Sequence, residues 1–156
     1  GGAWYSINFD SNSEKWSDND EAKTSLVKII DQLDYFTSTY ELNPKDISLI
    51  GFSQGAILSW ALLLDHPFLF RRAICMSGYI NYELLQKPLR EYQDVLAYCS
   101  HGSNDLTIPY EWAKSSIEYL KVKNPEVVFN TYPDGHNLSP ENFESFLKWI
   151  KKTNLE

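Results

Sequence analysis

The sequence predicts an α/β protein in which a mainly parallel sheet is covered by helices on both faces. After residue 20, strand-like apolar runs alternate with segments of helical periodicity, which is typical of parallel strands joined by crossover helices. The first such run, Ile47 to Phe52, is apolar on both faces, as expected of a strand inside a sheet. With 156 residues and 43% hydrophobic content, the chain has enough sequence for one domain with a buried core.

The elements are expected in the order helix, strand, helix, strand, strand, helix, strand, helix. Residues 11–20 are polar and predict a loop, and the apolar side chains from Asp20 to Tyr40 repeat every three or four positions, as in a surface helix. Residues 54–64 are apolar nearly all round, which predicts a helix buried against the sheet. The remaining predicted strands are 72–77, 94–100 and 126–132, and the remaining predicted helices are 110–122 and 140–150, the last capped by Ser139.

Composition argues against several classes of function. The net charge of −7 and the scattered basic residues disfavour a nucleic-acid partner, because phosphate binding depends on clustered Lys and Arg. Cys75 and Cys99 lie in apolar runs without metal-ligand or redox-motif spacing, so we expect buried, reduced thiols and no metal. No apolar stretch approaches the ~20 residues of a membrane-spanning helix, so stable membrane insertion is not expected.

The pentapeptide Gly51-Phe52-Ser53-Gln54-Gly55 stands between a predicted strand and a predicted helix. A Gly-x-Ser-x-Gly sequence at such a junction forces a sharp turn that exposes the serine hydroxyl as a nucleophile. Both glycines are expected to leave no room for a side chain, because the helix packs closely on the sheet. A glycine-rich turn also follows strands for structural reasons alone, so the pentapeptide by itself leaves both interpretations open.

Two further polar residues follow later strands. Asp105 comes after the strand predicted to end near residue 100, and His136 comes after the strand predicted to end near residue 132. Because the carboxyl ends of parallel strands meet at one edge of the sheet, we expect Ser53, Asp105 and His136 to lie close together. The chain order Ser, Asp, His is the order of a nucleophile-elbow enzyme.

Each of these residue types has a separate task in acyl transfer. Ser53 is the candidate nucleophile, and a neutral His136 would accept its proton and later return it to the leaving group. Asp105 would hold the imidazole in the correct tautomer and stabilise its protonated form. The backbone N–H of Gln54, at the start of the helix, is the candidate oxyanion donor.

Three other residues offer alternatives. His66 precedes a proline at a helix end and is interpreted as a capping or surface histidine. His101 directly follows a predicted strand and stays open as an alternative base, although its place after a buried run suits a structural hydrogen bond. Asp134 is an alternative acid, although its position two residues before His136 is more typical of a turn.

At these residues the chain resembles the α/β-hydrolase carboxylesterases and phospholipases that include the acyl-protein thioesterases. The resemblance implies a three-layer α/β-hydrolase fold, a serine esterase with the roles given above, and no metal or organic cofactor. It also implies that Trp4, Leu106 and Ile108 border the acyl pocket. The matching stretches are Gly2-Ala3-Trp4-Tyr5, Gly51 to Ala56, His101 to Asp105 with Ile108-Pro109, and Gly135-His136.

The resemblance favours a serine carboxylesterase that hydrolyses short-to-medium acyl esters, with a small-molecule acyl ester as its substrate. An acyl-protein thioesterase and a lysophospholipase share the acyl-enzyme chemistry and stay open. A binding module without activity is the alternative of another class, because fold does not determine function. A homodimer is a possible assembly, and the cytoplasm is the expected location.

One departure from the family concerns the amino-terminal side. Family members carry first strands and a His-Gly loop that completes the oxyanion hole, and nothing in this sequence corresponds to them. Residues 1–156 are therefore expected to be the carboxyl-terminal part of a single hydrolase catalytic domain, without its amino-terminal strands. The apolar run Ile47 to Phe52 agrees, because with only later strands beside it this run would be an open sheet edge, which natural proteins avoid.

Overall fold

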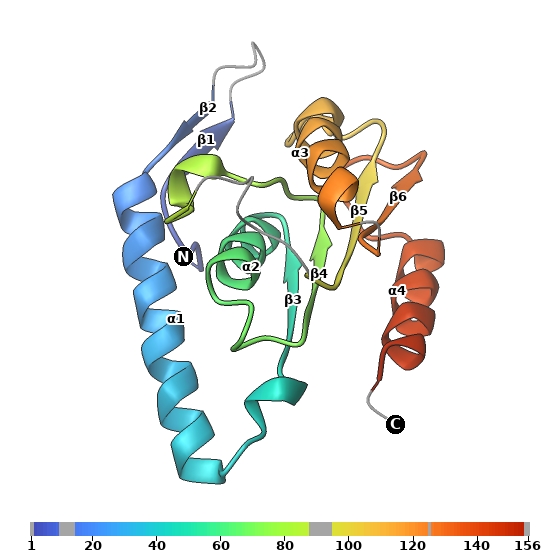
Figure 1. Ribbon diagram of the computed structural model, residues 1–156. Helices are drawn as coiled ribbons and strands as arrows, with labels where there is room; N and C mark the ends of the chain where they lie inside the picture. The colour runs from blue at the N-terminus through green and yellow to red at the C-terminus, as the bar shows by residue number, and fades with distance from the viewer. Residues whose placement is uncertain (1, 10–14, 88–94, 125, 155–156) are drawn as a thin grey trace.

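The computed structural model describes residues 2–9, 15–87, 95–124 and 126–154, and within them four parallel strands form the central sheet (Figure 1). The order is β3-β4-β5-β6, and every neighbouring pair is parallel. The strands are β3 (Ser48–Phe52), β4 (Arg72–Met76), β5 (Ala97–Gly102) and β6 (Val128–Tyr132). The helices are α1 (Asn19–Tyr40), α2 (Gln54–Asp65), α3 (Tyr110–Lys123) and α4 (Pro140–Lys152), with short 3₁₀ turns at Pro44–Asp46 and Tyr82–Leu84.

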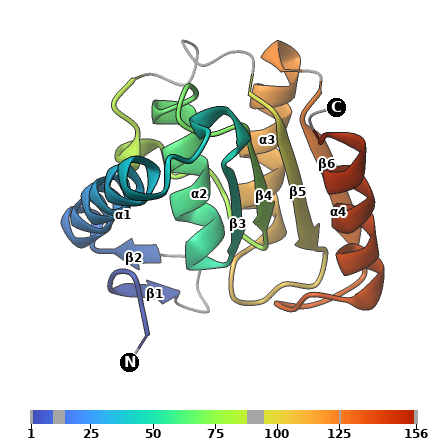
Figure 2. The same ribbon diagram turned by 90° about the horizontal axis from the view of Figure 1, so that it is seen from below.

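The sheet carries helices on both faces, which confirms the predicted fold class (Figure 2). Strand side chains alternate between the two faces. The small residues Ala73, Cys75, Ala97 and Cys99 pack in the same cluster as α2 and α3. Their neighbours on the strands, Ile74, Met76 and Tyr98, pack instead with Phe146 and Trp149 of α4.

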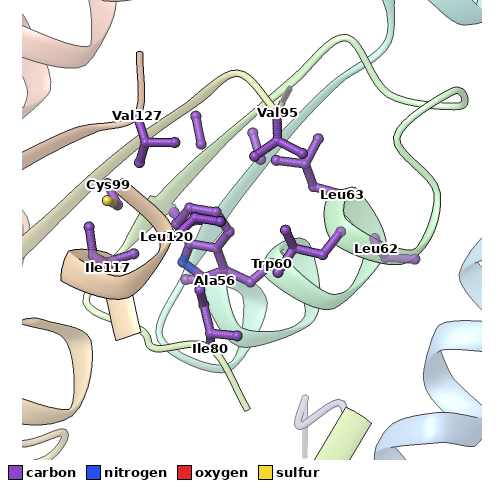
Figure 3. Packing of buried hydrophobic residues seen from close by; sticks show 14 of the residues in the cluster. Ala56, Trp60, Leu62, Leu63, Ile80, Val95, Cys99, Ile117, Leu120 and Val127 are labelled. Atoms are coloured by element: carbon purple, nitrogen blue, oxygen red, sulfur yellow. The ribbon is translucent and has the colours of Figure 1, made fainter. Parts of the chain in front are cut away.

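Helix α2 lies inside the molecule, as its apolar composition predicts. Residues 56–64 of α2 are all buried, because α2 packs against the sheet on one side and α1 covers its other side. Trp60 is only 1% exposed and lies among side chains from α2, α3 and the strands (Figure 3). A helix enclosed in this way holds its first turn, next to Ser53, in a fixed position.

The two cysteines are buried and free, as predicted. They face each other in register across β4 and β5, where Cys75 pairs with Cys99. Burial raises the pKa of both thiols well above the ordinary value. Because the thiolate is the reactive form, both side chains act here as small core residues.

Helix ends follow the capping signals in the sequence. The Asp18 side chain accepts a hydrogen bond from the Glu21 N–H at 2.9 Å and caps α1. Ser139 caps α4 by accepting from the Asn142 N–H, and Pro140 occupies the first helical position, as predicted.

The predicted polar loop at residues 11–20 is wrong where the structure describes it. Lys15–Ser17 form β2, which pairs antiparallel with β1 (Ile7–Phe9), and α1 already begins at Asn19. Residues 11–14 lie outside the described residues. Strands of three residues are too short for a periodic pattern, so backbone pairing formed them without a visible signal.

Strand β5 is shifted relative to its prediction. The predicted strand 94–100 is found at Ala97–Gly102, and residue 94 lies outside the described residues. His101 therefore lies within the strand instead of after it. The other predicted strands differ from the observed ones by at most two residues at either end.

Strand β3 lies at one end of the strand order. Within the described residues it pairs only with β4, and its Ile50 and Phe52 side chains are exposed. None of the described helices is both long and apolar enough to cross a membrane.

Candidate active site

Ser53 lies at the sharp turn from β3 into α2. Its backbone has φ 55° and ψ −119°, a strained conformation that a non-glycine residue adopts only when its surroundings hold it there. The Ser53 N–H donates to the Met76 carbonyl at 2.9 Å, which ties the turn to the neighbouring strand. The Ser53 side chain makes no capping bond to α2, so its hydroxyl is available to another partner.

The two glycines beside Ser53 differ in the space around them. A Cβ atom on Gly51 would lie 2.2 Å from the Gly55 carbonyl oxygen, so no side chain fits there. A Cβ atom on Gly55 would meet nothing within 4 Å in the described structure. The expectation that both positions exclude a side chain is therefore confirmed at Gly51 and wrong at Gly55.

The structure brings Ser53, His136 and Asp105 together from three different loops. His136 Nε2 is 2.9 Å from Ser53 Oγ, and His136 Nδ1 is 2.7 Å from Asp105 Oδ2. Since the carboxylate can only accept, Nδ1 carries the proton and Nε2 is left to accept from the serine hydroxyl. The arrangement can transfer a proton from Ser53 to His136 as the serine oxygen attacks an electrophile.

Both carboxylate oxygens of Asp105 accept hydrogen bonds. Its Oδ1 accepts from the N–H groups of Thr107 and Ile108, both at 2.8 Å. Burial by itself would raise the pKa of the carboxyl, but hydrogen bonds from His101, His136 and the two backbone N–H groups hold it well below its ordinary value. Asp105 is therefore ionised at neutral pH and can stabilise a protonated His136.

The depressed pKa of Asp105 predicts a contribution to acid stability. In the unfolded chain this carboxyl has a pKa of about 4, whereas in the folded protein it stays ionised at lower pH. Its ionisation therefore stabilises the fold fully above about pH 4, and this stabilisation is lost as the pH falls below that value. We expect Asp105→Asn to make the free energy of unfolding less sensitive to pH below about pH 4. Urea unfolding at a series of pH values measures this dependence. Asp34→Asn, at an exposed position, is the control for removing one charge. Equal slopes of unfolding free energy against pH for wild type and Asp105→Asn would contradict the prediction.

Close backbone packing joins the loop that carries Asp105 to the loop that carries His136. The Asn104 N–H donates to the Asp134 carbonyl at 2.9 Å, and the Ser103 N–H donates to the Tyr132 carbonyl at 2.8 Å. A Cβ atom on Gly102 would lie 2.3 Å from the Gly135 carbonyl oxygen and 2.4 Å from the Asp134 carbonyl oxygen. Gly102 therefore permits the approach that sets the distance between the two side chains.

If the site hydrolyses esters, Gly102→Ala is expected to lower kcat by up to about 10²-fold, because the added methyl group pushes the 134–136 loop away from Asp105. Gly135→Ala is the matched control, since its Cβ would come no closer than 3.8 Å to a neighbouring atom. Steady-state kinetics of both variants, with thermal unfolding as a check on folding, tests the prediction. Equal activities of the two variants would refute it.

The alternative residues lie elsewhere or have other partners. His66 caps the end of α2, where its N–H donates to the Leu62 carbonyl. Asp134 contributes its carbonyl to the loop contact with Asn104, which agrees with a turn residue. His101 is 1% exposed, and its Nε2 lies 2.8 Å from the Ile108 carbonyl oxygen, which is the structural hydrogen bond expected of it. Ser53 is paired with His136 and not with His101.

Of the three predicted pocket residues, only Trp4 lines a cavity with Ser53. That cavity has a volume of about 790 Å³ and has mostly apolar walls, which include Ile50 and Leu58. Leu106 is 95% exposed and does not line it, and Ile108 is 0% exposed in the core. Ile108 instead contributes its backbone, as a donor to Asp105 and as the acceptor for His101.

Two contacts at the site were not predicted from the sequence. The Gln54 side chain holds the amino-terminal segment, since its Oε1 accepts from the Trp4 N–H at 3.2 Å and its Nε2 donates to the Tyr5 carbonyl at 2.7 Å. The Phe52 ring packs against the His136 ring at 5.0 Å between centroids. Both contacts join residues far apart in the sequence, so no local pattern could reveal them.

The Gln54 backbone is placed as predicted, at the first position of α2. The first N–H groups of a helix have no partner within the helix and carry partial positive charge.

The chain is similar to known hydrolases. Residues 1–154 match the model of the phospholipase/carboxylesterase family. Among curated proteins, a probable carboxylesterase SOBER1-like of Arabidopsis thaliana is 27% identical over 114 residues, which cover 71% of this chain and 44% of that protein. Acyl-protein thioesterase 1 homolog 1 of Dictyostelium discoideum is 30% identical over 157 residues, or 97% of this chain and 67% of that protein. The matched stretches thus cover between 42% and 69% of the length of such relatives.

Not every relative is named as active. A protein of Oryza sativa subsp. japonica that is 22% identical over 152 residues, covering 88% of this chain and 62% of its own, is named a probable inactive carboxylesterase. Among solved structures, esterase PE8 superposes with a TM-score of 0.81 at 19% identity, over 99% of this chain and 71% of that one. At this identity the superposition shows the fold, which is that of the α/β-hydrolases. By its match over nearly the whole sequence, the chain belongs to the phospholipase/carboxylesterase family.

Proposed function

We propose that this protein is a serine carboxylesterase that hydrolyses short-to-medium acyl esters through an acyl-enzyme. The observation that carries the proposal is the unbroken line of contacts from Ser53 Oγ to His136 Nε2 at 2.9 Å and from His136 Nδ1 to Asp105 Oδ2 at 2.7 Å. Both distances are within hydrogen-bonding range, so His136 Nε2 can accept the Ser53 proton while Asp105 holds the proton on His136 Nδ1. The match to the phospholipase/carboxylesterase family supports a carboxylic ester as the substrate.

In the first half of the reaction, Ser53 Oγ bonds to the carbonyl carbon while His136 Nε2 accepts the hydroxyl proton. The carbonyl oxygen becomes an oxyanion, and the Gln54 N–H donates to it. The protonated His136 is stabilised by the ionised Asp105. When the intermediate collapses, the bond to the alcohol oxygen breaks, His136 protonates that alcohol, and the acyl group stays on Ser53.

In the second half, water replaces the alcohol. His136 Nε2 accepts a proton from the water as its oxygen attacks the acyl carbon, and the Gln54 N–H again stabilises the oxyanion. Collapse releases the carboxylic acid, and His136 returns its proton to Ser53 Oγ. Each proton transfer uses the two contacts of His136.

A second candidate is a thioesterase that removes acyl groups from cysteine side chains of proteins. The similarity to a protein named as an acyl-protein thioesterase homolog favours this candidate. Both reactions pass through the same acyl-enzyme, so they differ in the leaving group alone. Rates on matched oxygen and sulfur esters of one acyl chain separate them, since kcat/KM is the measure of discrimination.

The test is covalent labelling of the purified protein with a fluorophosphonate. Attack by Ser53 forms an Oγ–P bond and breaks the P–F bond, so fluoride leaves and the proton passes to His136. We expect mass spectrometry to find the adduct on the peptide that contains Ser53, and we expect turnover of short-chain p-nitrophenyl esters. A folded protein without label and without turnover would overturn the proposal and favour a binding module on the hydrolase fold.

A further inference from the structure

His101 is a buried histidine that the proposed reaction does not use. It lies within β5, in register with Thr131 of β6, and is only 1% exposed. The ring stands edge-on to the Tyr110 ring, with 6.2 Å between centroids. A residue fixed by a strand on its backbone and by packing on its ring has little freedom, so any contact that it makes is held in place.

The His101 ring points one nitrogen at two acceptors. Its Nε2 is 2.8 Å from the Ile108 carbonyl oxygen and 3.3 Å from Asp105 Oδ2. Since neither acceptor carries a proton at neutral pH, the His101 proton lies on Nε2, which donates to the Ile108 carbonyl and also lies against Asp105 Oδ2. His101 Nδ1 is buried and has no hydrogen-bond partner among the described residues, so a proton there would have no acceptor.

The two oxygens of Asp105 are held differently. Oδ1 accepts from the Thr107 and Ile108 N–H groups, which belong to the same loop as Asp105. Oδ2 faces two imidazole nitrogens, the Nδ1 of His136 at 2.7 Å and the Nε2 of His101 at 3.3 Å. His136 is on a loop and is the group that gains and loses a proton, whereas His101 is part of the sheet. His101 is therefore the rigid contact on the oxygen that orients His136.

We propose that His101 is a positioning residue for the reaction, which holds the Asp105 carboxylate and the 105–108 loop so that Oδ2 meets His136 Nδ1. This inference rests on the proposed function. It assigns His101 neither proton transfer nor substrate contact. Because His101 acts on the position of Asp105, its loss is expected to affect the chemical step more than substrate binding.

Two amide variants of different length test the proposal. His101→Gln can place its side-chain N–H three bonds from Cβ, the same number as His101 Nε2, whereas His101→Asn reaches only two bonds. Both are polar and uncharged, so the comparison isolates the reach of the donor. His66→Gln is the matched control, since His66 lies at the end of α2, outside the site. If His101→Asn does not fold, His101→Leu, which keeps the volume and lacks the donor, takes its place.

We expect His101→Asn to lower kcat by on the order of tenfold with KM within about twofold of wild type, because a small misplacement at the reacting groups reduces the rate of chemistry. His101→Gln should recover most of this loss, and the rate of fluorophosphonate labelling at Ser53 should follow kcat. A raised KM with unchanged kcat would assign His101 to the pocket and overturn the proposal. Equal kcat in the Gln and Asn variants would also overturn it, because the effect would then be one of packing.

The same experiments keep this proposal separate from the proposed function. If the wild-type protein is not labelled at Ser53, the proposed function fails and His101 has no reaction to support. If the wild type is labelled and His101→Asn keeps the wild-type kcat, the esterase proposal stands and the positioning role of His101 is wrong.

Discussion

Replacing Ser53 with alanine is expected to lower kcat for ester hydrolysis by on the order of 10⁶-fold and to abolish fluorophosphonate labelling. The physical reason is that Ser53 supplies the attacking oxygen, and within the described part of the chain its side chain hydrogen-bonds only to His136, at 2.9 Å. The fold should be unaffected, because the Ser53 side chain makes no capping bond and alanine adds no atoms. Steady-state hydrolysis of a p-nitrophenyl ester measures the loss, with active-site titration to exclude contaminating esterase.

Ser103→Ala is the matched control for Ser53→Ala. Ser103 is an exposed serine on the same side of the sheet, and its N–H bonds to the Tyr132 carbonyl through the backbone alone. We expect this variant to keep wild-type activity and labelling. Continued labelling of Ser53→Ala at another residue would contradict the assignment of the nucleophile.

Asp105→Asn is expected to lower kcat by on the order of 10⁴-fold, with much less effect on KM. An amide in place of the carboxylate can present an N–H to His136 Nδ1, which would then have to accept and leave its proton on Nε2. In that tautomer His136 cannot accept the proton of Ser53. The charge that stabilises the protonated imidazole is lost as well. Kinetics on the same ester, with unfolding measurements as a check on folding, tests this prediction.

Asp134→Asn separates the two acidic candidates. Asp134 takes part in the loop contact through its carbonyl oxygen, which the substitution keeps. We therefore expect this variant to retain activity within a few-fold of wild type. A large loss in Asp134→Asn together with a small one in Asp105→Asn would reverse the assignment of the acid.

Much of the fold could be predicted because its signals are local. The buried helix α2 follows from apolar residues all round, and α4 follows from Ser139 and Pro140 at its start. The pairing of β1 with β2 could not be predicted, since strands of three residues carry no period and their pairing depends on contacts between chain segments. The end of β5 was also missed, because the sequence of His101-Gly102 is equally typical of a loop.

At the site, the order of Ser53, Asp105 and His136 along the chain, each after a different strand, was enough to predict that they meet. This prediction succeeds because parallel strands bring their carboxyl ends to one edge. The pocket residues stay a prediction: Trp4 lies in a cavity wall with Ser53, Ile108 is buried, and Leu106 lies outside that cavity. Whether a loop side chain faces a cavity depends on backbone direction, which residue type does not determine.

The sequence by itself determined the fold class, the strand-to-helix turn at Ser53 and the three residues that converge there, because periodicity, turn chemistry and chain order are local or topological properties. Only the tertiary structure decided which histidine faces Ser53, that both imidazoles lie against the same oxygen of Asp105, and that Gly102 permits the two loops to approach. These features depend on distances of a few ångströms between segments that are remote in sequence. Such distances are fixed by packing of the whole core, and no single stretch of residues encodes them.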